Sequence, residues 1–164
     1  MAKELCEKVL GEDYTILEEM PGKSLEYKEY EPLYPYALNK LNGKKAFIVT
    51  CDDYVTTTDG SGIVHMAPAF GEDDSRVCHE YGIAFVQFVD AKGCMTADTD
   101  WPGVFVKKAD PKILKDLEEK GLLFSAPNFE HSYPHCWRCD TPLLYYARET
   151  WFIRMTAVRD KLNC

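Results

Sequence analysis

The sequence predicts a mixed domain of helices and strands, of the α+β class. Three observations support this prediction: β-branched residues fill 46–51, a helix with a clear start follows Asp110, and strands and helices succeed one another in no regular order. The 164 residues are enough for one domain with a sizeable core. The content of 46% hydrophobic and 28% charged residues is typical of a soluble globular protein.

The predicted elements follow from local patterns of apolar residues, glycine and proline. In chain order they are a helix at 3–10, a strand at 14–17, edge strands and loops at 23–36, strands at 46–51 and 63–66, a helix at 73–81, a strand at 85–89, a helix from 110 to 120, and strands at 122–125, 143–146 and 151–153.

Glycines mark the ends of all three helices, because glycine readily adopts the left-handed cap conformation: Gly11, Gly82 and Gly121. The third helix has the clearest start, with Asp110 as N-cap and Pro111 at the first position. We expect one face of that helix to pack on the sheet. Its apolar residues are Ile113, Leu114 and Leu117.

The strand at 46–51 is expected to pair with 63–66 through a hairpin turn at Asp59–Gly62. The preceding segment is rich in tyrosine. Its tyrosines form either an aromatic binding stripe or cover for the core, and cover is favoured because tyrosine suits half-buried positions. They are Tyr27, Tyr30, Tyr34 and Tyr36.

Charge and cysteine content restrict the class of protein. A net charge of −8 argues against a chain that grips a phosphate backbone by itself, although it permits one that receives only the end of a nucleic acid. Seven cysteines, mostly scattered, indicate reduced thiols and a cytoplasmic location. No signal peptide is visible, and no apolar run approaches the roughly 20 residues that span a bilayer.

The run Gly60–Asp74 is the most informative part of the chain. It predicts a turn, a buried strand ending at His65, a glycine loop and an acidic helix start. A histidine and a charged carboxylate at such a junction suit a ligand that carries an ammonium group and hydroxyls. The alternative is structural: Asp73 and Asp74 as first-turn helix residues, and His65 with a backbone partner.

With three further stretches, this run resembles isoleucyl-tRNA synthetase in its inserted editing domain. The stretches are His131–Leu143 (HSYPHCWRCDTPL), Trp151–Met155 (WFIRM) and Val89–Cys94 (VDAKGC), the last similar to the eukaryotic cytoplasmic form. The resemblance implies a β-barrel-like class I aminoacyl-tRNA synthetase editing domain with flanking helices. Residues 1–130 would form the editing core, and 131–164 would lead back toward the catalytic domain.

The resemblance also implies roles for individual residues. Asp74 would hold the α-ammonium group of the substrate, and His65 would contact the terminal ribose hydroxyls and help to place the water. Asp73 is interpreted as a solvated helix-start residue, and is a weaker candidate for binding. The remaining expected binding residues form the bend and the pocket wall: Gly62, Met66, Ala67 and Pro68.

The implied activity is hydrolysis of valine from mischarged tRNA(Ile). The expected partners are the aminoacylated 3′ end of that tRNA, its valine moiety and the catalytic domain of the parent enzyme, with no membrane. The parent would need ATP and Mg²⁺ as cofactors, and this segment none. Thr56–Thr58 are not followed by the Pro-Trp-Thr of the family's threonine-rich loop. The chain is therefore expected to be truncated at its N-terminus, and weakly active or inactive alone.

Cys136 and Cys139 have the spacing of zinc ligands, with His131 and His135 nearby. A structural zinc site needs four ligands, and no second Cys-x-x-Cys pair occurs in the chain, so we expect no bound zinc. The alternative to a hydrolytic domain is a non-catalytic interaction module that resembles a zinc ribbon.

Overall fold

Helices are the regular elements of the computed structural model, which describes residues 1–58, 60–128 and 132–162. The α-helices are α1 (Cys6–Leu10), α2 (Glu72–Glu80), α3 (Val106–Glu119) and α4 (Met155–Leu162), and short 3-10 helices span Lys3–Leu5, Gly22–Leu25 and Pro35–Lys40. Within the described ranges, β pairing is limited to isolated bridges. The β-barrel-like fold and the division at residue 130 remain predictions.

The segment 46–51 is extended, but it is not the regular strand that the sequence predicts. It pairs with the tyrosine-rich segment before it: the Tyr27 N–H donates to the Val49 carbonyl over 2.8 Å. The predicted pairing with 63–66 is wrong, since no β-bridge joins these two described segments. Phe47 (φ +52°) and Tyr27 (φ +65°) adopt left-handed backbone conformations, which interrupt a regular ladder.

A short antiparallel meander leads into α3. Val89, at the end of a predicted strand, forms a bridge with Met95, and Cys94 forms another with Phe105. The turn between the first two segments is held by Asp90, whose carboxylate accepts the backbone N–H groups of the residues two and four positions later (2.8 and 2.9 Å). These donors hold the pKa of the Asp90 carboxyl below its usual range.

Two of the helices predicted from glycine positions are confirmed. Gly11 (φ +76°) follows α1, and Gly82 (φ +69°) lies two residues beyond the end of α2. The second helix begins one residue earlier than predicted, at Glu72. Its inner face carries Val77 and Cys78, which are 0% and 2% exposed, so α2 is anchored in the core.

The predicted start of α3 is wrong. The helix begins at Val106, four residues before Asp110, and Pro111 lies inside it. The Val106 N–H donates to the Gly93 carbonyl (3.0 Å), and Ala109 is buried at 1% exposure, so the helix is already packed before the proline. Of the predicted apolar face, Ile113 and Leu117 are half-buried and Leu114 is exposed.

Five predicted strands are wrong, since no bridge forms there among the described residues: 14–17, 63–66, 122–125, 143–146 and 151–153. Their apolar side chains are largely uncovered, with Leu17 94%, Phe124 73% and Trp151 100% exposed. A strand is stable only when it is paired along its length and one of its faces is packed, and none of these segments is paired as a ladder. The predicted hairpin turn includes Asp59, which lies outside the described residues.

The cover interpretation holds for Tyr34 and Tyr36, which are half-buried, but not for Tyr27 and Tyr30, which are 54% and 50% exposed. Tyr34 and Tyr36 stack with their ring centroids 5.3 Å apart, and the Tyr34 hydroxyl donates to Asp116 of α3 over 2.7 Å. The Tyr36 hydroxyl donates to Asp100 over 2.7 Å. Burial and this carboxylate raise the pKa of Tyr36 to about 12. These rings therefore fill the space between the segment and its neighbours.

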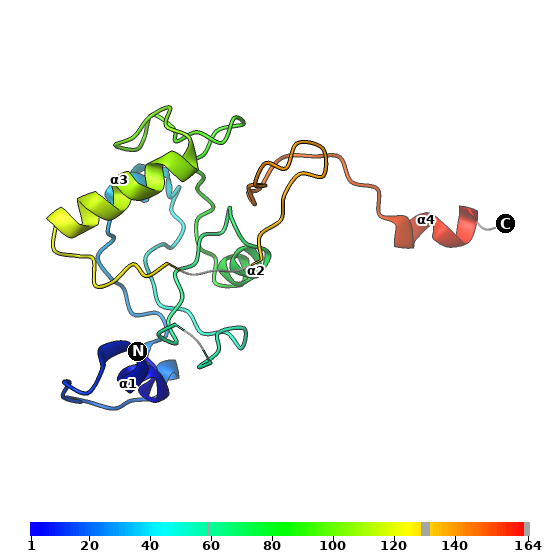
Figure 1. Cartoon of the computed structure of the whole chain (residues 1–164). Coiled ribbons are helices and arrows are strands. Elements are labelled where there is room, and N and C mark those ends of the chain that lie inside the picture. The colour runs from blue at the N-terminus through cyan, green and yellow to red at the C-terminus, as the bar shows by residue number, and fades with distance from the viewer. Residues whose placement is uncertain (59, 129–131, 163–164) are drawn as a thin grey trace.

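The buried core is smaller than the length of the chain suggests. Among the described residues, the buried hydrophobic side chains are few and mostly small: Leu5, Ile48, Ala69, Val77, Cys78, Ala84, Val89 and Ala109. In Figure 1, α1 lies at one end of the body, α3 crosses the opposite end, and the chain then leads away from the body to α4. No helix in the described part is long and apolar enough to cross a membrane.

Candidate functional site

Asp74 joins the loop before α2 to the helix. One carboxylate oxygen, Oδ2, accepts the Ala67 N–H over 3.1 Å, and the other, Oδ1, accepts the Tyr54 hydroxyl over 3.1 Å. The side chain is half-buried in the first turn of the helix. Each carboxylate oxygen has a second lone pair, so Asp74 retains the capacity to accept hydrogen bonds from a ligand.

The start of α2 favours a charged carboxylate at this place. Its first turn carries Glu72, Asp73 and Asp74, and the unpaired N–H groups of a helix start stabilise negative charge. Gly71, the N-cap, leaves room for the carboxylate: a Cβ there would lie 3.0 Å from both Cγ and Oδ2 of Asp74. The backbone of Gly71 is ordinary extended chain (φ −146°), so the requirement for glycine is steric.

Tyr54 is the functional candidate that the sequence reading missed. Burial and the neighbouring charge of Asp74 raise the pKa of Tyr54 to about 12, so its hydroxyl is a permanent donor at neutral pH. The two residues are 20 positions apart, and no motif links them. Only the folded chain brings them together.

Asp73 belongs to a different group of charges. It lies 3.7 Å from Arg76, whose guanidinium also donates to both oxygens of Asp52 (3.0 Å each) and to Glu80 (3.3 Å). This guanidinium lowers the pKa of the Asp52 carboxyl. Asp73 is exposed, as expected for a solvated residue of the helix start.

His65 and the pocket-wall residues occupy the chain between the glycine bend and α2. The His65 side chain is exposed, and no hydrogen bond or ion pair joins it to Asp74 in the described residues. Met66, Ala67 and Pro68 are half-buried, and the thioether of Met66 accepts a hydrogen bond from Thr50 over 3.7 Å. Ile63 and Val64, just before His65, are also exposed (66% and 50%), so the predicted buried strand ending at His65 is wrong.

Gly62 makes its close approach to the chain itself. Its φ is +71°, and a Cβ there would lie 2.5 Å from the Cβ of Ala2. The Ala2 N–H donates to the adjacent Ser61 carbonyl over 2.8 Å. The N-terminal segment therefore packs against the bend at Gly62. The sequence predicts a close approach of this bend to a ligand, and it does not predict this contact within the chain.

Cys136 and Cys139 lie in a tight turn closed by the bridge between His135 and Pro142. The Cys139 thiol is 3.0 Å from the Thr141 hydroxyl, and hydrogen bonds from this residue lower the pKa of Cys139. Within the described residues, no group of three or more His, Cys, Asp or Glu side chains is arranged to hold a metal ion. His131, the other nearby histidine, lies outside those residues.

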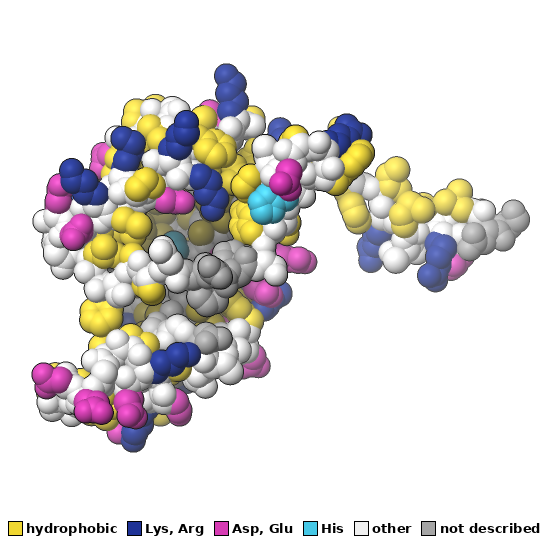
Figure 2. Space-filling model, in the orientation of Figure 1, with side chains coloured by type: hydrophobic (Ala, Val, Ile, Leu, Met, Phe, Trp, Pro, Cys, Tyr) yellow, Lys and Arg dark blue, Asp and Glu magenta, His cyan; other side chains and the backbone are white. Residues whose placement is uncertain are grey.

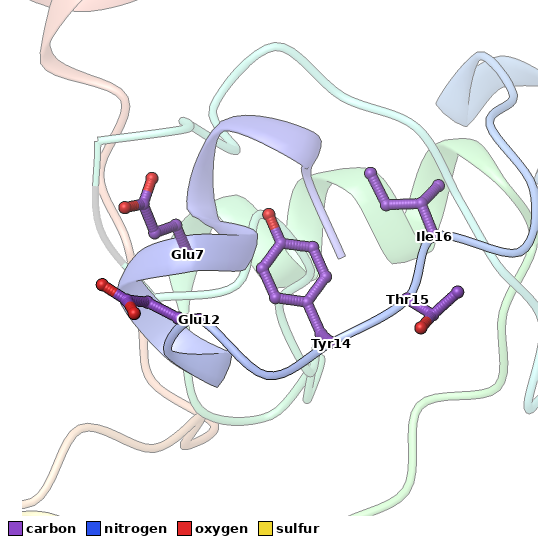
Figure 3. A pocket seen from close by; sticks show the side chains of 5 residues that line it. All are labelled: Glu7, Glu12, Tyr14, Thr15 and Ile16. Carbon is purple, nitrogen blue, oxygen red and sulfur yellow. The ribbon is translucent and has the colours of Figure 1, made fainter.

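Two surface hollows are described, and neither is lined by His65 or Asp74. A shallow depression of about 620 Å³ beside α1, shown in Figure 3, is lined by Glu7, Glu12, Tyr14, Thr15 and Ile16. A second hollow, of about 340 Å³, lies between the start of α3 and the segment that follows the cysteine turn. It is lined by Phe70, Val89, Val106, Lys107, Asp110, Tyr133, Leu144, Tyr145 and Tyr146.

Known relatives of the chain are aminoacyl-tRNA ligases, and the chain is homologous to a segment of such an enzyme. The particular enzyme is isoleucine--tRNA ligase. The chain is 52% identical to that of Clostridium novyi over 163 residues, 48% identical to that of Streptomyces avermitilis over 166, and 45% identical to that of Thermus thermophilus over 158. These matches cover 99%, 99% and 96% of the chain.

The chain spans 15% of the length of each of these relatives. No family model matches it. The relatives are bacterial, so they support the resemblance to isoleucyl-tRNA synthetase but not to its eukaryotic cytoplasmic form, which Val89–Cys94 had suggested.

Proposed function

We propose that the chain is most of the editing domain of an isoleucyl-tRNA synthetase, and that in the whole enzyme it hydrolyses valine from mischarged tRNA(Ile). The observation that carries the proposal is the position of Asp74. Its carboxylate is held by two donors at the junction of loop and helix, in the motif that also contains the exposed His65. The homology to isoleucine--tRNA ligase over nearly the whole chain supports it.

Such an activity compensates for a limit on how well one binding pocket can distinguish valine from isoleucine. A pocket that accepts isoleucine cannot strongly reject valine, because one methylene group is worth only about 1–3 kcal/mol; this pair of amino acids is the standard example of the problem. A second site that hydrolyses the smaller product raises the accuracy. The aminoacyl ester is already activated, so water can attack it without a nucleophilic side chain.

Each residue of the motif then has a role. Asp74 accepts hydrogen bonds from the α-ammonium group, which are charge-assisted and therefore strong. His65 binds the terminal ribose hydroxyls and helps to place the water, as an exposed imidazole can. The pocket wall is formed by Met66, Ala67 and Pro68, and Gly62 belongs to the bend before it. Asp73 forms an ion pair with Arg76 and has no part in binding in this scheme.

The proposed partners are the aminoacylated 3′ end of the tRNA and the rest of the synthetase. The net charge of −8 suits a domain that receives the end of a nucleic acid held elsewhere.

Large apolar side chains are exposed in the segment that leads to α4, including Trp151 (100%) and Phe152 (83%). We propose that they pack against the catalytic domain, since patches of this kind mark interaction sites. Figure 2 shows hydrophobic side chains along this extension.

The hydrolysis needs no cofactor in this scheme, whereas ATP and Mg²⁺ belong to the synthetic reaction of the whole enzyme. The zinc-ribbon-like interaction module remains the second candidate, because the cysteine turn at 136–141 has the form of half a zinc site. Metal content together with deacylation activity distinguishes the two functions.

The test is deacylation of valyl-tRNA(Ile) by the full-length synthetase and two variants. Asp74→Ala should reduce hydrolysis by about 10- to 100-fold, the loss expected for one hydrogen bond to a charged group. His65→Ala should also slow it, through lost positioning of the ribose and water. Isoleucylation by both variants should remain near the wild-type rate. Wild-type deacylation by Asp74→Ala would refute the assignment.

A further inference from the structure

We propose that Tyr54 is a positioning residue for Asp74, and that it makes the editing site selective for esters that carry an α-ammonium group. The inference rests on the proposed function, and it adds a residue that no sequence motif indicates. Its basis is the hydrogen bond from the Tyr54 hydroxyl to Oδ1 of Asp74, 3.1 Å long and part-buried.

The Asp74 carboxylate is held from two separate segments of the chain. Ala67, in the loop before α2, donates its N–H to one oxygen, and Tyr54, 20 residues before Asp74, donates its hydroxyl to the other. Gly71 closely approaches the same group from a third place: a Cβ there would lie 3.0 Å from Cγ and Oδ2 of Asp74, a tight contact. Two donors on different oxygens fix the rotation of the carboxylate about its last bond, which one donor alone would not do.

A fixed carboxylate matters for a cationic ligand. A hydrogen bond to an ammonium group is directional, and a prearranged acceptor loses less conformational freedom when the ligand binds. With one lone pair on each oxygen engaged by the protein, the other lone pairs remain for the ligand. Without the Tyr54 hydroxyl the carboxylate would rotate more freely, and its contact with the ammonium group would weaken.

Tyr54 itself is suited to the task. The hydroxyl must donate at the pH of the cell, and the high pKa caused by burial and by Asp74 keeps it protonated. The neighbouring backbone is anchored as well: the Tyr54 N–H donates to the Asp52 carboxylate (3.1 Å), which pairs with Arg76 of α2. The backbone of Tyr54 is therefore linked through Asp52 to α2, the helix that carries Asp74.

The experiment uses the full-length synthetase with Tyr54→Phe, which removes only the hydroxyl. Two esters of tRNA(Ile) are compared: valyl, and 2-hydroxyisovaleryl, in which a hydroxyl replaces the ammonium group. We expect Tyr54→Phe to hydrolyse the valyl ester about tenfold more slowly, and the hydroxy ester within about twofold of the wild-type rate, because the removed bond acts through a charged contact. The matched control is Tyr14→Phe, a change far from Asp74 in sequence that should leave both rates unchanged.

Equal slowing of both esters by Tyr54→Phe would show a merely structural role and overturn the inference, as would wild-type hydrolysis of both. The double variant gives a second measurement: Tyr54→Phe should add no further slowing to Asp74→Ala if the hydroxyl acts only through that carboxylate. Asp74→Ala alone distinguishes a failure of the proposed function from a failure of the inference about Tyr54. If it deacylates normally, the proposed function fails and this inference with it; if it is slow while Tyr54→Phe is normal, only the inference fails.

Discussion

The junction before α2 and the C-terminal segment differ in what holds their side chains. At the junction, polar groups find partners within the chain: Asp74 accepts two hydrogen bonds, and Arg76 contacts three carboxylates. In residues 132–162, large apolar side chains such as Trp151 and Phe152 are exposed (100% and 83%), although the segment also contacts the body. In one such contact, the Ala147 N–H donates to the Ala69 carbonyl over 2.7 Å.

On our proposal, the junction is a site whose geometry is set within the chain, and the C-terminal segment is a surface that another part of the enzyme covers. Polar groups that are satisfied locally keep their geometry whatever the rest of the protein does. Exposed aromatic side chains gain stability only when another surface covers them. Because the chain spans 15% of its relatives, that covering surface is expected in the remainder of such an enzyme.

The largest expected difference between the two regions is in stability. Val77→Ala removes a fully buried side chain from α2 and should lower the free energy of unfolding by about 1–3 kcal/mol. Trp151→Ser changes a fully exposed residue and should change it by less than about 0.5 kcal/mol. Urea unfolding of the chain measures both. Equal shifts would mean that the C-terminal segment is packed after all.

A pair of glycines tests the contact between the C-terminal segment and the body. Gly93 (φ +76°) has Leu144 Cδ1 2.7 Å and Phe105 Cε2 3.0 Å from the position of a Cβ, whereas Gly103 (φ +75°) has nothing within 4 Å. Alanine at either position costs about 1–2 kcal/mol for the backbone conformation alone. Gly93→Ala should cost about 1 kcal/mol more than Gly103→Ala because of the clash. Identical urea midpoints would contradict the contact.

A smaller effect is expected from pH. Arg76 lowers the folded-state pKa of the Asp52 carboxyl below its ordinary value of 3.8. The ion pair therefore contributes its full stability above about pH 4, and loses it as the pH falls through the lower folded pKa. Arg76→Gln should reduce stability at pH 7 and make the remaining stability less sensitive to acid below about pH 4. Parallel pH curves for the two proteins would argue against this pair.

The smallest effect is expected from metal removal. The cysteine turn offers two thiols, and a structural zinc site needs four ligands, so the purified chain should contain no stoichiometric zinc, and a chelator should not change its unfolding. Elemental analysis after dialysis against a weak chelator measures this. About one zinc per chain would overturn the prediction and make His135 a leading additional ligand.

Local signals in the sequence predicted the helix ends better than the strands. Gly82 and Gly121 (φ +69° and +66°) mark helix ends because a left-handed cap is a property of one residue, and Gly11 ends α1 in a different conformation (φ +76°, ψ −153°). Pro111 predicts a start of α3 that is too late in the chain. The helix already begins at Val106, because Val106 and Ala109 are stabilised by contacts with other parts of the fold. The β-branched residues of 46–51 predict extended chain, but no residue in this run predicts the left-handed conformation of Phe47.

The candidate site was predictable only in part for the same reason. Asp74 and His65 lie in one continuous motif, which the sequence displays directly. Tyr54 and Gly71 act through space: one donates to Asp74 from a segment 20 residues away, and the other leaves room for its carboxylate. Such relations depend on the path of the chain, and composition or spacing does not reveal them.

The central claim is that Asp74 binds the ammonium group of an aminoacyl ester at this junction. The most direct measurement is a crystal structure of the full-length synthetase with a non-hydrolysable amide analogue of valyl-adenosine. We predict the ammonium nitrogen at about 2.7–2.9 Å from an Asp74 carboxylate oxygen, with the Tyr54 hydroxyl still bound to Oδ1 and the ribose hydroxyls beside His65. An analogue bound elsewhere, with its ammonium group beyond hydrogen-bond reach of Asp74, would contradict the account.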